Sequence, residues 1–113
     1  MATDAQSAMS EALDRMWARF LPQMRERVDS LDATAQAFAA GTLSVERQEE
    51  AQSAAHKLAG VLGTFGLTRG TVLARELELT FARESSPGSE GSAKLAATVA
   101  ELRTMVESRK PAT

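Results

Sequence analysis

Residues 7–40, SAMSEALDRMWARFLPQMRERVDSLDATAQAFAA, decide the fold class of this chain. Their apolar residues recur at steps of three and four, which is the spacing of one face of an α-helix. The stripe consists of Met9, Leu13, Met16, Trp17, Phe20, Leu21, Met24, Val28, Leu31, Ala35 and Phe38. Pro22 lies inside it, and a proline either bends a helix or stands in the first turn of a new one. We expect one long helix that bends near Pro22.

Helix breakers divide the remainder of the chain. Gly41 is suited to end the first helix, because glycine readily adopts the left-handed conformation that follows a helix. The hydroxyl of Ser44 can then cap a helix over residues 45–65 by accepting a hydrogen bond from the first turn. Gly66 provides the next break.

Two further segments have helical spacing. The first covers residues 68–84, with Thr68 as its cap, and the second covers 93–108 after a serine- and glycine-rich loop at 85–92. The predicted buried faces are Val72, Leu73, Leu77 and Phe81 in the first and Leu95, Val99, Leu102 and Val106 in the second. We expect residues 109–113 to form a frayed tail outside the fold.

Four amphipathic segments with short connections predict an all-α protein, an antiparallel up-and-down four-helix bundle. The chain has 113 residues, which suits one domain covering 1–113, and we expect a stand-alone monomer. Because the first helix is longer than the others, its apolar end offers dimerisation through Met9, Trp17 or Phe20 as an alternative.

Composition excludes several classes of function. A formal net charge of -2 offers little attraction to nucleic acid. With no cysteine there is no disulfide, thiolate zinc site or cysteine nucleophile. The chain shows neither a secretory signal nor an apolar run of the roughly 20 residues that span a bilayer. We therefore expect a cytoplasmic protein without nucleic-acid or membrane partners.

His56 is the one histidine, and it lies in the middle of the second predicted helix. The core stripe of that helix is Ala51, Ala55, Leu58, Leu62 and Phe65. At about 100° per residue, His56 points about 160° away from Leu58. The imidazole should therefore face solvent.

Gly60 and Gly63 follow His56 on the same predicted face, one and two turns later. Each costs about 0.5–1 kcal/mol relative to alanine in a helix. One interpretation is that they clear the imidazole for the close approach of another protein. The alternative is that they pack against a neighbouring helix or loosen the helix near its end.

The stretch AHKLAG at 55–60, with FGL at 65–67 and LARELE at 73–78, resembles the signature of histidine-containing phosphotransfer (HPt) domains. Those domains are four-helix bundles that carry phosphate between receiver domains in two-component phosphorelays. The family pattern is His, any residue, Leu, Lys, Gly, which His56, Leu58 and Gly60 match. Ala59 stands where the family often has lysine.

The resemblance implies that His56 is the phosphoacceptor and that response-regulator receiver domains, with a hybrid sensor kinase as a further candidate, are the partners. It implies no cofactor of the protein's own, since the receiver supplies Mg²⁺. Lys57 or Arg69 would supply the charge that assists transfer. An ordinary histidine, with a pKa of about 6.5, is largely neutral and nucleophilic near pH 7.

No glycine-rich phosphate loop is present, so a phosphocarrier rather than a kinase is expected. Two other classes stay open. One is a helical adaptor that binds a receiver without accepting phosphate. The other is a metal or haem protein in which His56 pairs with Met9, Met16, Met24 or Met105. The acidic pairs Glu49 with Glu50 and Glu76 with Glu78 are typical of solvated faces and receive no role here.

Overall fold

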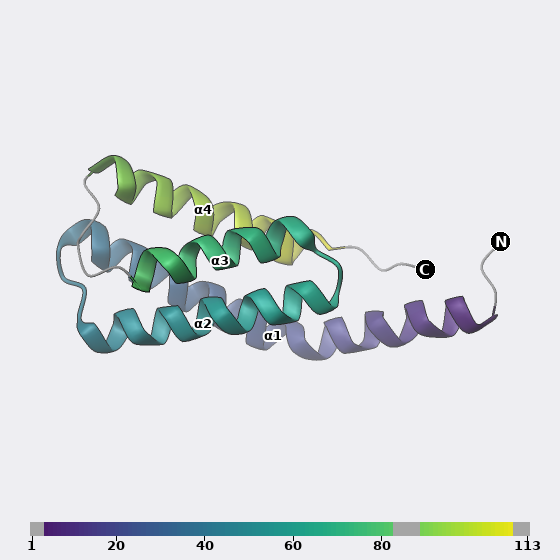
Figure 1. Ribbon diagram of the computed structural model, residues 1–113. Coiled ribbons are helices and arrows are strands. Elements are labelled where there is room, and N and C mark those ends of the chain that lie inside the picture. The colour runs from purple at the N-terminus through teal and green to yellow at the C-terminus, as the bar shows by residue number, and fades with distance from the viewer. Residues whose placement is uncertain (1–3, 83–88, 110–113) are drawn as a thin grey trace.

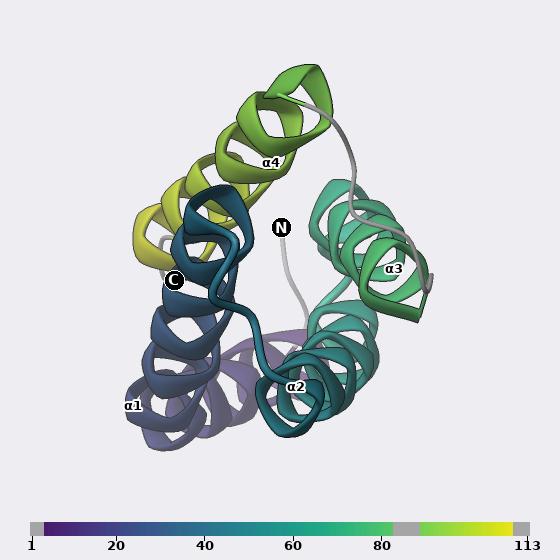
Figure 2. The ribbon, with the colours of Figure 1, turned by 90° about the vertical axis from the view of Figure 1, so that its left-hand side faces the viewer.

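A computed structural model describes residues 4–82 and 89–109, and these form four α-helices (Figure 1). The helices are α1 (Asp4–Ala40), α2 (Val45–Thr64), α3 (Thr68–Ala82) and α4 (Ser89–Ser108). Consecutive helices run in opposite directions, and each packs against the helices beside it in a ring that follows chain order (Figure 2). The predicted all-α four-helix bundle is confirmed.

α1 is one helix of 37 residues with Pro22 inside it, as the sequence predicts. It changes direction along its length (Figures 1 and 2), which is expected where a proline removes one backbone hydrogen bond. Its N-terminal part extends beyond the other helices, so the apolar stripe is exposed at its start. Met9 is 63% and Met16 40% exposed, whereas Trp17 is buried. Trp17 is therefore not available as a dimerisation surface.

Glycines end α1 and α2 at the positions that the sequence predicts. Gly41 has φ +71° and Gly66 has φ +73°, values in the left-handed region that favours glycine. After Gly66, the N–H of Leu67 donates to the carbonyl of Leu62 at 2.9 Å, which closes the end of α2. At the other end of α2, the hydroxyl of Ser44 accepts the N–H of Arg47 at 3.1 Å.

The start of α3 differs from the prediction. Thr68 is the first residue of the helix and not its cap, because the Leu67 carbonyl already accepts the N–H of Thr71 at 3.0 Å. Val72 is 42% exposed, although the sequence analysis placed it in the core. The buried stripe of α3 passes instead through Gly70 and Ala74. Val72 lies one residue from Leu73 and therefore about 100° around the helix from it.

α4 also differs at both ends. It begins at Ser89, inside the segment predicted as a loop, since a glycine such as Gly91 is tolerated in a first turn. Arg109 does not fray: its guanidinium lies 5.0 Å from the ring centre of Trp17 and pairs with Asp14 at 3.2 Å. The predicted end of the third helix beyond 82, the loop residues 85–88 and the tail residues 110–113 lie outside the described residues.

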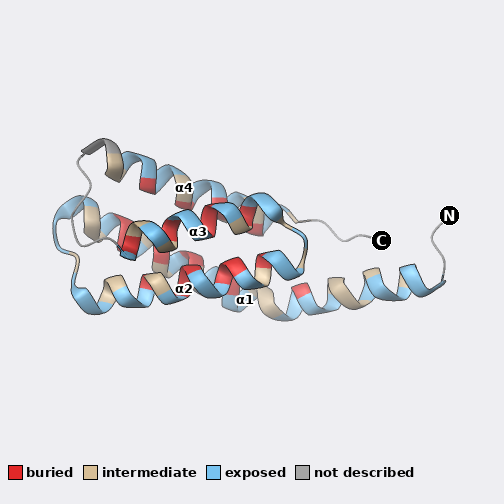
Figure 3. Ribbon diagram, viewed as in Figure 1, coloured by how far each residue is buried: buried red, intermediate tan, exposed pale blue. Residues whose placement is uncertain are grey.

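The core runs along the middle of the bundle (Figure 3), and the predicted stripe of α4 is buried in it. α2 and α3 approach closely at Gly70, where an added Cβ would lie 3.0 Å from a methyl carbon of Leu62. The packing of α2 against α3 brings residues of α3 beside His56.

Within residues 4–82 and 89–109, no helix has the length and apolar character needed to cross a membrane.

Candidate functional site

His56 stands near the middle of α2, and its side chain is 75% exposed. The outward direction predicted from helical spacing is confirmed, because Ala55 and Leu58 beside it are buried in the core. The imidazole is thus a solvent-accessible ring on a helix whose opposite face is fixed by packing.

A carboxylate on the neighbouring helix holds this ring. Nδ1 of His56 lies 3.0 Å from Oε1 of Glu78 on α3. An ionised carboxylate oxygen can only accept a hydrogen bond, so in this contact the N–H of Nδ1 is the donor and Glu78 the acceptor. In the neutral imidazole, Nε2 then keeps its lone pair and is available as a nucleophile. Sequence reasoning assigned Glu78 no role, because the contact depends on how α3 packs against α2.

His56 borders a shallow depression between α2 and α3. Its lining residues are His56, Ala59, Gly60, Arg75, Glu78 and Leu79. The depression therefore combines an imidazole, a carboxylate and a guanidinium with small or apolar neighbours. Arg75 was not singled out in the sequence.

Gly60 and Gly63 have different surroundings. An added Cβ at Gly60 would meet nothing within 4 Å, so the surface there is open. At Gly63 an added Cβ would lie 3.6 Å from Oγ1 of Thr71 on α3. The geometry thus fits the clearance interpretation for Gly60. At Gly63 the distance is an ordinary van der Waals contact, so packing against α3 does not require glycine there.

The two cations suggested by the sequence lie elsewhere. Lys57 faces α1, where it lines a groove with Met16, Phe20 and Arg27. Arg69 donates to Glu101 on α4 at 3.1 and 3.3 Å, which raises the pKa of its guanidinium. The structure therefore brings Arg75, rather than Lys57 or Arg69, into the depression with His56.

A groove between α1 and α2, with a largely apolar lining, lies beside the site. Its lining consists of Met16, Phe20, Arg27, Lys57, Gly60, Val61, Thr64 and Phe65. Gly60 belongs both to this groove and to the depression of His56. An apolar surface with two cations therefore continues directly into the imidazole site.

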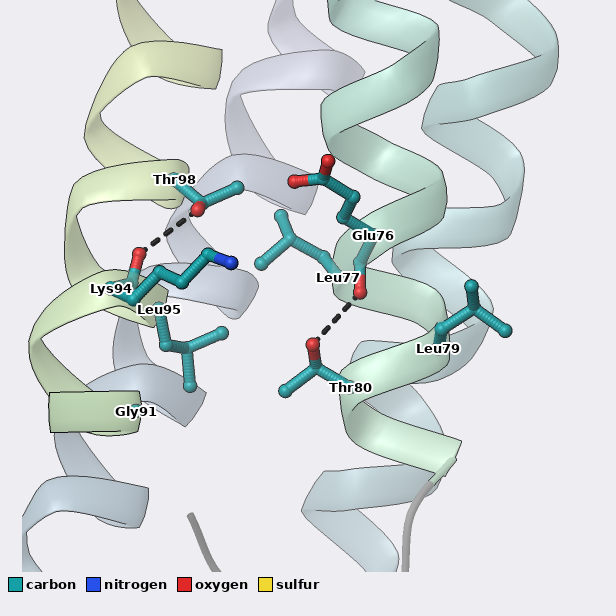
Figure 4. Close-up of a pocket in the computed structure, with 8 residues that line it drawn as sticks. All are labelled: Glu76, Leu77, Leu79, Thr80, Gly91, Lys94, Leu95 and Thr98. Carbon is teal, nitrogen blue, oxygen red and sulfur yellow. Dashed lines mark hydrogen bonds between the residues drawn. The ribbon is translucent and has the colours of Figure 1, made fainter. Parts of the chain in front are cut away.

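A second depression, between α3 and α4, lies on the other side of α3 (Figure 4). Glu76 and Lys94 extend from facing helices into it, while Leu79 points away from it. Leu79 lines this depression at its edge and also lines the depression of His56. The two depressions thus meet at Leu79 and share no other lining residue.

The metal and haem alternatives find no support in this arrangement. Among the described residues, no group of three or more acidic or histidine side chains could hold a metal ion. None of the residues lining the depression of His56 is a methionine. Met24 is fully buried in the core, as expected for a side chain that fills space there.

The described residues thus form a four-helix bundle with an exposed imidazole that is oriented by a carboxylate of the neighbouring helix. Comparison with protein families matches the Hpt domain over residues 15–110, and the chain belongs to this family. It is also 37% identical over 76 residues to Protein RcaC of Microchaete diplosiphon, an alignment that spans 67% of this chain but 12% of that protein. No solved structure matches.

Family membership assigns a coarse function. Hpt domains carry phosphoryl groups between proteins of phosphorelays, interact with response-regulator receiver domains, and are phosphocarriers rather than kinases. The resemblance seen in the sequence is therefore confirmed.

Proposed function

We propose that His56 accepts a phosphoryl group from the aspartyl phosphate of one receiver domain and passes it to another receiver. The contact between Nδ1 of His56 and Glu78 carries this proposal, because it leaves Nε2 as a nucleophile on an exposed ring. His56 is also the single imidazole of the chain. A hybrid sensor kinase is a further candidate source of phosphate, and we place the monomeric carrier in the cytoplasm with its receivers.

The transfer step needs no proton to move. The Nε2 lone pair attacks phosphorus, an N–P bond forms, and the P–O bond to the receiver aspartate breaks with its electron pair leaving on the carboxylate. Nδ1 keeps its proton, so the phosphorylated ring is cationic. The carboxylate of Glu78 opposes that charge at the atom where it is held. Transfer to the next receiver reverses the same step.

The metal ion belongs to the partner. A receiver brings an acidic pocket with Mg²⁺, which neutralises charge on the phosphoryl oxygens during transfer. This chain has only to present His56 at the correct distance. A cofactor of its own is therefore not required.

The groove between α1 and α2 is the surface on which we place the receiver. Phe20 and Val61 provide apolar contact there, and Arg27 and Lys57 suit an acidic partner. The open surface at Gly60 lets the partner's backbone reach the imidazole. Lys57→Ala should therefore slow transfer mainly by weakening docking.

A non-phosphorylated adaptor is the second candidate function, and Ala59 favours it. This residue is buried and cannot supply the cation that the family often has at this position. Such a protein would bind receivers through the same groove but would not become labelled.

Incubation with a phosphorylated receiver and Mg²⁺ separates the two functions. A label on His56 should be lost in acid and survive alkali, as a phosphoramidate does. His56→Gln should abolish it while changing the free energy of unfolding by no more than about 0.5 kcal/mol, because the ring is exposed. Receiver binding without label, or label retained in His56→Gln, would contradict the proposal.

A further inference from the structure

Arg75 is a cation without a partner beside the proposed phosphoacceptor. It lines the depression of His56, together with Ala59 and Glu78. Arg25, Arg69, Arg103 and Arg109 each form an ion pair with a carboxylate. Within residues 4–82 and 89–109, the guanidinium of Arg75 has no ion pair or hydrogen bond.

The register of α3 explains this placement. Thr71 and Glu78 lie on the flank of α3 that faces α2, since they contact the Ala59 carbonyl and His56. Arg75 is four residues after Thr71 and three before Glu78, which puts it on the same flank. Arg69 lies on the opposite flank, where it meets Glu101.

Ala59 lies across the depression from α3 and ends at its Cβ. The surface therefore lacks a long side chain from α2 at the position where the family often has lysine. Arg75 lines the same depression from α3. The space that the short side chain leaves is thus bordered by a cation from the neighbouring helix.

The charges around His56 leave the guanidinium of Arg75 available to bind a phosphoryl group. Glu78 is the acidic residue that lines the depression, and its carboxylate already accepts a hydrogen bond from Nδ1 of His56. A phosphoryl group on Nε2 would bring up to two negative charges into the depression. A guanidinium can donate two parallel hydrogen bonds to such a group.

Resting on the function proposed above, we infer that Arg75 binds the phosphoryl group once it is on His56 and takes the role that a lysine at position 59 would otherwise have. The guanidinium favours the phosphorylated carrier over the free one. Loss of Arg75 should therefore shift the phosphoryl equilibrium toward the receiver, besides slowing transfer.

The test compares Arg75→Gln with Arg75→Lys and with Arg47→Gln. Arg47 lies on α2, nine positions before His56, so its loss removes the same charge at a distance from the site. At equilibrium with one receiver, Arg75→Gln should lower the ratio of phosphorylated carrier to phosphorylated receiver by about threefold to tenfold. Arg75→Lys should lie between it and the wild type, and Arg47→Gln should match the wild type.

A second measurement needs no receiver. The small-molecule donor phosphoramidate can phosphorylate the purified protein, and the ³¹P resonance then reports protonation of the phosphoryl group. A nearby guanidinium favours the dianion, so Arg75→Gln should raise the phosphoryl pKa. Circular dichroism verifies that the variant is folded.

The outcomes distinguish the two proposals. A wild-type protein that takes no phosphate from receivers or phosphoramidate would overturn both. A wild type labelled on His56, with Arg75→Gln equal to Arg47→Gln in equilibrium ratio and ³¹P titration, would overturn only the role of Arg75. Arg75→Gln could also change the transfer rate but leave the equilibrium ratio and the ³¹P titration unchanged. Arg75 would then contact the receiver and not the phosphoryl group, and this result would also overturn the inference about Arg75.

Discussion

Oε1 of Glu78 accepts a hydrogen bond from Nδ1 of His56 across the contact between α2 and α3, at 3.0 Å. The side chain of Glu78 is 28% exposed, compared with 75% for His56, so the acid is the more firmly packed of the pair. The contact selects one tautomer and directs Nε2 outward. In the proposed transfer, a residue of α3 thereby determines which ring nitrogen of His56 acts as the nucleophile.

Glu78→Ala is expected to slow phosphoryl transfer by about tenfold, since it removes both the orienting acceptor and the opposing charge. Glu78→Gln keeps an acceptor oxygen without the charge, so its transfer rate should lie between those of the wild type and Glu78→Ala. Transfer rates measured with a saturating receiver test this. In ¹⁵N spectra, the neutral imidazole should carry its proton mainly on Nδ1 in the wild type and lose that preference in Glu78→Ala. Unchanged spectra would contradict the assigned contact.

Gly60 provides the sharpest test of the docking surface. Gly60→Ala should stabilise the fold by about 0.5–1 kcal/mol, because an added Cβ meets nothing within 4 Å and alanine is the better helix former. Gly60→Leu should also fold, but should weaken receiver binding by filling the space that the partner needs. Titration calorimetry with a receiver compares the two variants. Normal binding by Gly60→Leu would place the receiver elsewhere.

The helices were predictable because each depends on local chemistry. The apolar spacing of α1, the cap at Ser44 and the left-handed glycines Gly41 and Gly66 act within a few residues of one another. The helix boundaries were harder to predict where a capping preference competes with the way in which the preceding helix ends. Thr68 is a good capping residue but does not occupy the cap position, because the backbone that ends α2 leads directly into α3.

The site was predictable only in part, for the same reason. The direction of His56 follows from the periodicity of its own helix. Its partners Glu78 and Arg75 depend on the register between α2 and α3, which the close approach at Gly70 sets. Acidic and basic residues on a solvated helix face are common, so neither stood out. The spacing of Thr71, Arg75 and Glu78 on one flank was the available signal.

Gly70 is expected to respond in the opposite way to Gly60. Gly70→Val should destabilise the fold by about 1–3 kcal/mol, because its Cβ would lie 3.0 Å from a methyl carbon of Leu62, itself fully buried. The shift of α3 should also lengthen the contact between His56 and Glu78. Urea unfolding measures the first effect and the ¹⁵N spectrum of the imidazole the second. A variant as stable as the wild type would show that α2 and α3 can separate freely.

Arg109 anchors the C-terminal end of the described chain to α1. Its guanidinium lies 5.0 Å from the ring centre of Trp17 and 5.3 Å from that of Phe65, and it pairs with Asp14. Arg109→Ala should cost about 1–2 kcal/mol in the free energy of unfolding, since packing and charge are lost together. Arg109→Lys should recover part of this. Near-ultraviolet circular dichroism of Trp17 should weaken in Arg109→Ala, and an unchanged spectrum would argue against the stacking.

Acid should weaken the contact between α1 and α4. Glu107 accepts two hydrogen bonds from Arg25, which lower the pKa of its carboxyl below the ordinary value of 4.5. A lowered folded pKa means that the stabilisation is present above the ordinary value and is lost as pH falls through the folded one. Glu107→Gln cannot titrate, so its free energy of unfolding should fall less than that of the wild type between about pH 6 and about pH 3. Parallel curves for the two proteins would show that this ion pair contributes nothing to folding in solution.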